Sequence, residues 1–306
     1  MNLGTDTTTT SITVRVPAKV NVQLAVGAAR PDGFHDLANV FLAVGLHDEV
    51  TATPADTLRI TAEGHDVDRI PLDRTNLAAR AAELLAARHG IEPRVHLHIR
   101  KDIPVAGGMA GGSADAAAAL LACDTLWSTG STREELLALC AELGSDVPFS
   151  LVGGAALGRG RGELLTPLPV GGTFHWVFAV ADGGLSTPAV YGEFDRLTAG
   201  TAVPEPEPAP DLLAALESGD ATALAASLTN DLQPAALSLC PPLTATLSAG
   251  TTAGALAALV SGSGPTTAFL VKDAETAREV ASALLASGTC RQTRVAEGPV
   301  AGATVL

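Results

Sequence analysis

Aromatic residues and cysteines are both scarce in this chain, and each scarcity narrows what the chain can be. Aromatic residues make up 3% of the 306 positions, so an exposed Phe or Tyr beside a glycine-rich turn becomes a candidate ligand contact. The four cysteines, at positions 123, 140, 240 and 290, form no C-x-x-C pair. We therefore expect neither a disulfide framework nor a zinc site, but reduced thiols in a cytoplasmic protein.

Basic residues are also few, with 19 Lys and Arg against 33 Asp and Glu and a net charge of −14. This balance argues against a nucleic acid or an anionic membrane surface as the partner, although local cations and helix ends could hold a small anionic substrate. No apolar run reaches the length of a membrane span. The first ten residues lack the pattern of a signal peptide, and we expect them to be disordered.

The familiar phosphate-binding motifs are missing as well, yet residues 101–127 predict a phosphate site of another kind. Residues 94–100 alternate apolar and polar side chains, which indicates a half-buried strand. Four glycines follow within positions 107–112, and Ser113 is expected to cap a helix that has Asp115 in its first turn. A strand, a glycine turn and a helix start form an anion site, because the backbone can approach closely and offers unpaired N–H groups.

A nucleotide polyphosphate fits this predicted site best, and a flexible linker or plain turn is the alternative. The chain has no Gly-Lys-Ser/Thr, so a Walker loop is excluded, and the glycine spacing is not G-x-G-x-x-G. Phosphate binding therefore has to use a different loop.

Polar residues at three other places are candidates for chemistry. Residues 12–24 read as one strand, or as two broken at Pro17, with Lys19 and Asn21 on the polar face; the pattern alone favours a solvated lysine. Phe34 and His35 follow the turn 31–33 and could form a lid on a planar ring, although a His at a turn is usually just solvated.

Asp146 is the third candidate. It lies between a helix that is predicted to end at Gly144 and an apolar stretch, 150–157, that reads as a strand. A carboxylate in that position is equally well a turn residue whose hydrogen bonds are made locally or a catalytic base. The turn 158–163, GRGRGE, could carry a further basic contact.

The remaining elements are predicted from periodicity and capping signals. Helices are expected at 76–89, 131–143 (with a capping box of Ser131 and Glu134), 187–197, 211–218, 221–229, 242–249 and 273–287. Strands are expected at 40–46, 50–62 (a pair), 173–181 and 266–271. The Pro/Glu-rich loop 200–210 is a poor candidate for order.

Several short motifs, spread over nearly the whole chain, coincide with one known family. They are residues 17–21 (PAKVN), 32–35 (DGFH), 104–117, 144–149 (GSDVPF), 158–160 (GRG), 230–232 (NDL) and 261–265 (SGSGP). On these residues the chain resembles the GHMP kinases. The DGFH and SDVPF segments are most similar to the members whose substrate carries a cytidine diphosphate.

The resemblance implies a two-domain α+β fold with the active site in the cleft between the domains. An ATP-binding domain would span residues 1–163, and a ferredoxin-like substrate domain would span 164–306. The implied reaction uses ATP and Mg²⁺ to phosphorylate the 2-hydroxyl of a methylerythritol unit, in the non-mevalonate route to isoprenoids. No oligomeric state and no metal ligands are implied.

The resemblance also implies roles for single residues. Asp146 would accept the hydroxyl proton, and Lys19 would orient it and offset phosphoryl charge. Phosphate contacts would come from Pro104, Val105, Ala106, Gly107, Gly108, Met109, Ala110, Gly111, Gly112, Ser113 and Ala114. Substrate contacts would come from Asn21, Phe34, His35, Ser261, Gly262, Ser263 and Gly264.

The chain departs from the family pattern at a few positions, and two alternatives stay open. Ala110 and Ala114 replace a glycine and a serine of the usual loop, and Phe34 stands where Tyr is common. A GHMP kinase for homoserine or a mevalonate derivative is one alternative, although those substrates carry no base to stack on Phe34. A non-catalytic nucleotide-binding or RNA-binding protein is the other, which the acidic charge and the retained Lys19 and Asp146 oppose.

Overall fold

Two β-sheets organise the chain, which the computed structural model describes over residues 11–105 and 107–306. Among these residues, eight strands form the first sheet, in the order β12-β1-β2-β4-β3 with β5, β6 and β8 attached at its side. Four more form the second sheet, in the order β11-β7-β10-β9. Residues 1–10, predicted to be disordered, and Ala106 of the predicted phosphate loop lie outside the described residues.

The observed elements confirm the predicted mixture of helices and strands. The strands are β1 (Ile12–Ala29), β2 (His35–Pro54), β3 (Arg59–Gly64), β4 (Val95–Lys101), β5 (Ala155–Arg159), β6 (Leu164–Pro167), β7 (Phe174–Val180), β8 (Thr229–Asn230), β9 (Ala257–Val260), β10 (Thr267–Val271), β11 (Gln292–Gly298) and β12 (Thr304–Val305). The helices are α1 (Leu77–His89), α2 (Gly111–Trp127), α3 (Arg133–Leu143), α4 (Val147–Val152), α5 (Thr187–Thr198), α6 (Pro210–Ser218), α7 (Ala221–Ser227), α8 (Gln233–Leu239), α9 (Leu243–Thr252), α10 (Ala274–Ala286) and the 3-10 turn η1 (Val67–Arg69).

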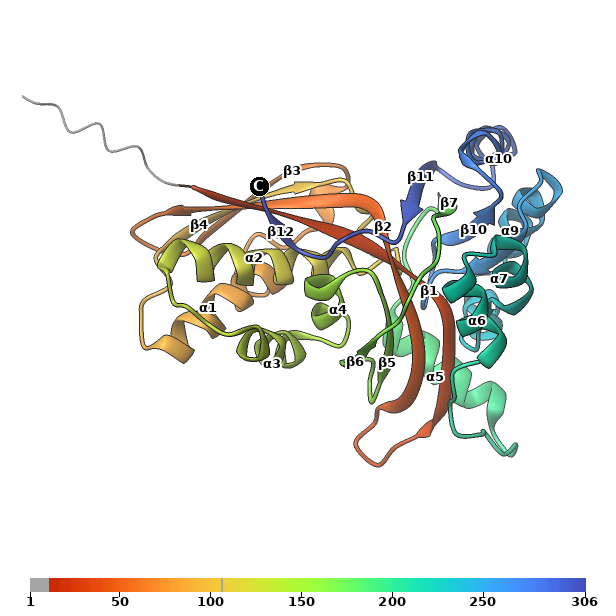
Figure 1. Cartoon of the computed structure of the whole chain (residues 1–306), viewed down its shortest axis with the longest axis horizontal. Coiled ribbons are helices and arrows are strands. Elements are labelled where there is room, and N and C mark those ends of the chain that lie inside the picture. Colours follow the sequence, from red (N-terminus) through yellow and green to blue (C-terminus); the bar gives the residue numbers. More distant parts are fainter. Residues whose placement is uncertain (1–10, 106) are drawn as a thin grey trace, which may run out of the picture.

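The long antiparallel strands β1 and β2 run from one lobe of the molecule into the other (Figure 1). Val14, Val16 and Val20 of β1 are fully buried, as their alternation predicts. A register shift between Pro17 and Ala18 lets β1 continue as a single strand. On its other face Lys19 is only 4% exposed, so the interpretation as a solvated lysine is wrong.

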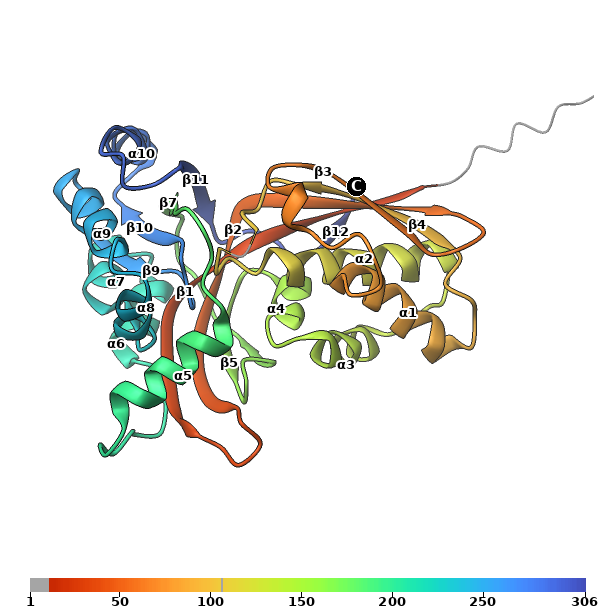
Figure 2. The ribbon, with the colours of Figure 1, turned by 180° about the vertical axis from the view of Figure 1, so that it is seen from behind.

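Helices α1 to α4 cover one face of the first sheet, and α2 is the central one (Figures 1 and 2). Alanine is the commonest residue of α2, and Ala116 to Ala119 are fully buried where the helix lies against both β1 and β2. Small side chains permit this close packing on several sides at once. Its N-terminal end is thereby fixed beside Lys19, at the junction of the lobes.

The second lobe holds the four-stranded sheet with α5 to α10 around it (Figure 1). Two later segments return to the first sheet: β8 pairs in parallel with β1, and β12 pairs with the start of β1. The predicted boundary between 163 and 164 falls inside the β5–β6 hairpin, and the boundary stays a prediction.

Some local predictions are corrected by the structure. The stretch after Asp146 is not all strand: α4 comes first, tolerates Pro148 in its first turn and ends at Gly153. The capping box of α3 uses Thr132 and Glu135, because the N–H of Ser131 donates to Asp124 instead. Strands β2 and β3, predicted as a pair, are separated by β4.

Further elements were not predicted, and one loop is more firmly held than its composition suggests. Helix α8 and strands β6 and β11 carry no strong periodic signal over their short lengths. The Pro/Glu-rich loop is a loop as predicted, but it is tied to β1, since the side-chain amide of Gln23 donates to the Glu207 carbonyl and accepts from the N–H of Ala209.

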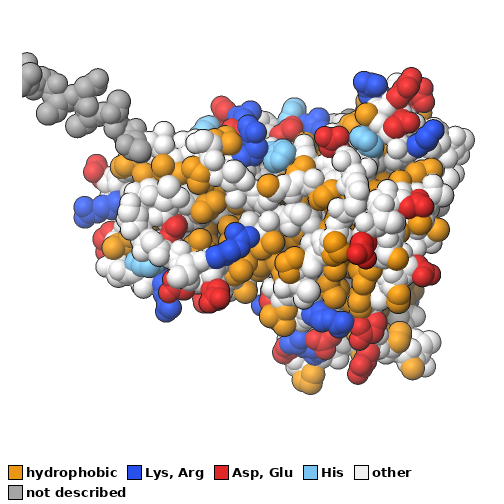
Figure 3. Space-filling model, in the orientation of Figure 1, with side chains coloured by type: hydrophobic (Ala, Val, Ile, Leu, Met, Phe, Trp, Pro, Cys, Tyr) orange, Lys and Arg blue, Asp and Glu red, His pale blue; other side chains and the backbone are white. Residues whose placement is uncertain are grey.

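Figure 3 shows the surface that results. Hydrophobic side chains gather over the centre of this face, and charged side chains of both signs spread around it. None of the described helices has the length and hydropathy that crossing a bilayer requires.

Candidate active site

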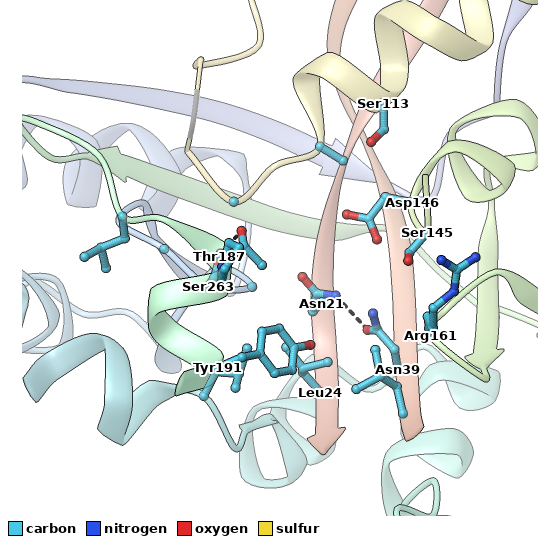
Figure 4. Close-up of a pocket in the computed structure, with 18 of the residues that line it drawn as sticks. Asn21, Leu24, Asn39, Ser113, Ser145, Asp146, Arg161, Thr187, Tyr191 and Ser263 are labelled. Carbon is cyan, nitrogen blue, oxygen red and sulfur yellow. Dashed lines mark hydrogen bonds between the residues drawn. The ribbon is translucent and has the colours of Figure 1, made fainter. Parts of the chain in front are cut away.

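A cavity of about 720 Å³ lies at the junction of the two lobes (Figure 4). Its walls come from β1, β2, the glycine loop with the start of α2, the turn before α4, helix α5 and the second glycine turn. Fourteen of the predicted site residues line it: Lys19, Asn21, Phe34, His35, Gly107, Gly108, Ala110, Gly111, Gly112, Ser113, Asp146, Gly262, Ser263 and Gly264. Residues far apart in sequence thus meet at one site, as the motifs imply.

Lys19 and Asp146 face each other in this cavity. The ammonium nitrogen of Lys19 lies 3.5 Å from a carboxylate oxygen of Asp146, which is about one-third exposed. It also donates to the side-chain oxygen of Asn21 at 2.7 Å and to the carbonyl of Gly108 at 3.0 Å. These contacts fix the ammonium between the carboxylate and the glycine loop, where it can act on both a proton acceptor and an incoming phosphate.

The glycine loop leads directly into the open N-terminus of α2. Gly108 and Ala110 both have left-handed backbone conformations, with φ of 73° and 61°, and Ala110 is the N-cap residue. The helix therefore begins at Gly111, and Ser113 is its third residue rather than the predicted cap. No side chain caps this end, so its first N–H groups and the Ser113 hydroxyl face the cavity, which suits an anionic ligand.

At the other end of the cavity lie aromatic side chains. The ring of Phe34 is 47% exposed, while His35 is buried and shares a 2.9 Å hydrogen bond with Asp195. The ring of Tyr191 lies 4.9 Å from that of His35, centroid to centroid. Burial, and to a lesser degree the charge on Asp146, raises the pKa of Tyr191, so its hydroxyl stays protonated. A planar ring could stack here.

The second glycine turn closes the cavity from the other lobe. The side-chain amide of Asn230 donates to the carbonyls of Val260 and Gly262, and Ser263 shares a 2.9 Å hydrogen bond with Thr187 at the start of α5. Ser261 is fully buried, and its hydroxyl donates to the Gly108 carbonyl at 3.2 Å. The two glycine turns are therefore in direct contact.

Not every predicted site residue reaches the cavity. Met109, Ala114 and Ser261 are fully buried, and together with Pro104 and Val105 they do not line it. Their predicted contacts with phosphate or substrate stay predictions. They shape the loop or the turn from behind.

Several cavity residues were missed by the sequence reasoning. They are Asn39, whose amide oxygen accepts from Asn21 at 2.6 Å, and Ser145, Arg161, Thr187, Tyr191 and Asp195. The basic turn at 158–163 was noted, but not Arg161 itself. Tyr191 is the chain's single tyrosine, and that scarcity was the one available signal for it.

A buried ionic cluster supports the glycine loop from beneath. The ammonium of Lys101 contacts Asp48, lies 2.7 Å from Asp115 and donates to the Gly111 carbonyl at 3.4 Å. Asp48 also accepts the backbone N–H groups of residues 102 and 103. Burial alone would lower the pKa of Lys101, but the two carboxylates outweigh it and raise the pKa. Both ends of the loop are thereby tied to one ammonium.

Comparison with known families identifies the class of this site. Residues 76–154 match the model for the GHMP kinases N terminal domain, and residues 212–289 match the model for the GHMP kinases C terminal. The glycine loop, α2 and Asp146 fall in the first match. The second glycine turn falls in the other. The chain is therefore a GHMP kinase.

Relatives narrow the family further. A 4-diphosphocytidyl-2-C-methyl-D-erythritol kinase of Streptomyces avermitilis is 78% identical over 97% of this chain and 100% of its own length. One of Thermobifida fusca is 61% identical over 97% of this chain and 99% of its own. A crystal structure of 4-(cytidine 5'-diphospho)-2C-methyl-D-erythritol kinase matches with a TM-score of 0.75 at 33% identity, covering 93% of this chain and 98% of that one. Within the GHMP kinases, the chain belongs to this family.

Proposed function

We propose that the chain transfers a phosphoryl group from ATP to the 2-hydroxyl of 4-diphosphocytidyl-2-C-methyl-D-erythritol. The observation that carries the proposal is the Lys19–Asp146 pair, set between an open helix N-terminus and a pocket end lined by Phe34 and His35. The first feature suits a triphosphate and the second a pyrimidine base. The reacting hydroxyl has to lie between them.

The reaction requires positioning and charge neutralisation more than covalent chemistry. The glycine loop and the first N–H groups of α2 would hold the ATP phosphates, with the helix dipole adding positive potential. Asp146 would accept the proton of the attacking hydroxyl. Lys19 would keep the carboxylate oriented and offset the charge that develops on the transferring group.

Mg²⁺ would enter with ATP rather than through a protein-built site. In the described part of the chain, no cluster of three or more His, Cys, Asp or Glu could hold a metal ion. Mg²⁺ in kinases keeps several waters and uses one or two protein oxygens besides the phosphates, which the Ser113 hydroxyl and the Asp146 carboxylate could supply. When bound, the ion would neutralise phosphate charge.

On the base side, Phe34 and Tyr191 offer aromatic faces, and His35 offers a ring nitrogen that Asp195 orients. These groups favour the cytidine-diphosphate substrate over homoserine or mevalonate, which have no ring to stack. Solved structures of homoserine kinase and mevalonate kinase, at 22% and 15% identity, share the fold alone. We place the reaction in the cytoplasm, in keeping with four free cysteine thiols.

The test offers ATP and Mg²⁺ with one acceptor at a time: the cytidine-diphosphate compound, homoserine or mevalonate. ADP release with the first acceptor alone is the expected result. Release with another acceptor would move the chain to a different GHMP activity, and ATP binding without ADP release from any acceptor would support a non-catalytic role.

A further inference from the structure

Arg161 sits at the tip of the β5–β6 hairpin, in a turn that is built to aim it at the cavity. Its two neighbours, Gly160 and Gly162, have left-handed φ values of 67° and 108°. The Gly160 carbonyl accepts the N–H of Leu37 on β2 at 2.8 Å, and the N–H of Arg161 donates to the Glu163 carboxylate at 2.7 Å. The backbone of this turn is therefore held firmly against the pocket wall.

The guanidinium of Arg161 makes only long polar contacts with the rest of the described protein. Its contact with Glu163 is 3.6 Å long, and its hydrogen bond to the Ala141 carbonyl is 3.5 Å long, both beyond the usual range of such bonds. About one-third of the side chain is exposed. A guanidinium carries five N–H donors in a planar fork that matches phosphate oxygens.

Arg161 differs from the other basic side chain of the cavity in how fully its charge is paired. Among the described residues that line the cavity, Lys19 and Arg161 are the only Lys or Arg. Lys19 is engaged by Asp146, Asn21 and the Gly108 carbonyl. Arg161 is the cation left for an anionic group that lies away from the glycine loop.

Its position fits one part of the substrate under the proposed function. The guanidinium carbon lies 4.9 Å from the centre of the Phe34 ring, the aromatic side chain expected to stack on the base. In Figure 4 the same guanidinium lies on the side of the pocket that carries Ser145 and Asp146. A diphosphate joins the base to the reacting alcohol, so it must cross from Phe34 toward Asp146.

We propose that Arg161 binds the diphosphate of the cytidine-diphosphate substrate and selects for substrates that carry one. The inference rests on the proposed function. A fork of N–H donors would bind the phosphate oxygens, while the cation–π contact with Phe34 would hold the guanidinium near the base. Arg161 would then recognise the diphosphate, and Phe34 would recognise the base.

The test uses calorimetry with two probes, cytidine and cytidine 5′-diphosphate, after a non-hydrolysable ATP analogue has saturated the ATP site. For Arg161→Ala, we expect the dissociation constant of the diphosphate to rise about 10-fold or more and that of cytidine to change less than about 2-fold. Arg161→Lys keeps a charge but not the fork, so its affinity for the diphosphate should be intermediate.

The matched control is Arg159→Ala, which removes the same charge two residues away. Arg159 is half exposed, pairs with Glu207 at 2.8 Å and does not line the cavity, so both dissociation constants should stay within about 2-fold of the parent values. If Arg159→Ala weakened binding of the diphosphate as much as Arg161→Ala, the effect would come from the net charge of the protein rather than from a contact, and the inference would be overturned. Thermal unfolding should show all three variants folded.

Other outcomes also overturn the inference. Equal losses for cytidine and its diphosphate would mean that Arg161 only supports Phe34, and weaker binding of the ATP analogue instead would place Arg161 on the nucleotide side. If the parent phosphorylates the substrate but Arg161→Ala binds both probes as the parent does, only this inference fails. If the parent neither binds the probes nor phosphorylates the substrate, the proposed function fails with it.

Discussion

The carbonyl oxygen of Ser261 occupies the space beside Gly108 that a side chain would need. A β-carbon built on Gly108 would lie 2.0 Å from that oxygen, and the backbone of Gly108 is left-handed, with φ of 73°. The carbonyl of Gly108 in turn accepts from Lys19 and from the Ser261 hydroxyl. The shape of the phosphate loop therefore depends on backbone that belongs to the other lobe.

Substitution of Gly108 should consequently damage ATP binding. Gly108→Ala adds a β-carbon to a left-handed residue, which costs about 1 kcal/mol, and it also forces the two turns apart. We expect the dissociation constant of an ATP analogue to rise about 10-fold or more, because the loop would no longer present its N–H groups together. Calorimetric titration measures the change.

Gly112→Ala is the comparison for stability. A β-carbon there meets only Leu77, at 3.7 Å, and the residue lies in the first turn of α2. Its melting temperature should equal or exceed that of the parent, since alanine favours the helix. An ATP affinity of Gly108→Ala equal to that of the parent would show that the contact with Ser261 does not shape the loop.

Local patterns were enough to predict the strand–loop–helix unit and the parity of β1. The alternation of Val95, Leu97 and Ile99, the run of glycines and the alanine-rich stretch each act over a few residues, so the sequence displays them directly. The predicted cap was wrong, because Ala110 adopts a left-handed conformation that is unusual for alanine. The helix therefore begins at Gly111, two residues before Ser113.

The burial of Lys19 and the cavity residues on α5 depend on contacts that no local pattern contains. Asp195 is hydrogen-bonded to His35, which lies 160 positions away in the sequence, and Lys101 is hydrogen-bonded to Asp48, which lies 53 positions away. A charged residue looks solvated until its distant partner is known. Family resemblance rather than pattern brought Lys19 and Asp146 together in the prediction.

The cluster around Lys101 leads to a prediction about pH. Burial first, and then the charge on Asp48, raises the pKa of Asp115 to about 7, although Lys101 opposes the shift. The folded state therefore keeps a proton that the unfolded state has lost, and this contribution makes the free energy of unfolding fall as pH rises from about 4 to about 7.

Asp115→Asn cannot titrate and should remove this contribution. Relative to the parent, the variant should gain about 1 kcal/mol or more in unfolding free energy between about pH 5 and pH 8. Urea unfolding at several pH values measures the difference. A difference that stays constant with pH would mean that Asp115 is ionised throughout.

Recognition of the base should depend on Phe34. Phe34→Ala should raise KM for the cytidine-diphosphate substrate about 5-fold to 150-fold, because stacking of a base on an aromatic ring contributes roughly 1–3 kcal/mol in single-strand binding. KM for ATP should barely change, and Phe34→Tyr should be mild. Since the ring is 47% exposed, the melting temperature should hold. Equal increases in both KM values would instead indicate a folding role.

Lys19 and Asp146 should behave as one unit, because both act on the same proton and the same transferring group. Asp146→Asn keeps the shape but loses the basicity, so kcat should fall about 10²-fold to 10⁴-fold with substrate binding largely kept. Lys19→Met keeps the stem and loses the charge 3.5 Å from the carboxylate, and its kcat should fall similarly. The double variant should be little worse than either single one, since residues that act together are strongly non-additive. Steady-state kinetics on folded variants test this expectation. Losses that multiply would show that the two residues act independently, and a near-parental kcat for Asp146→Asn would leave Asp146 as a structural turn residue.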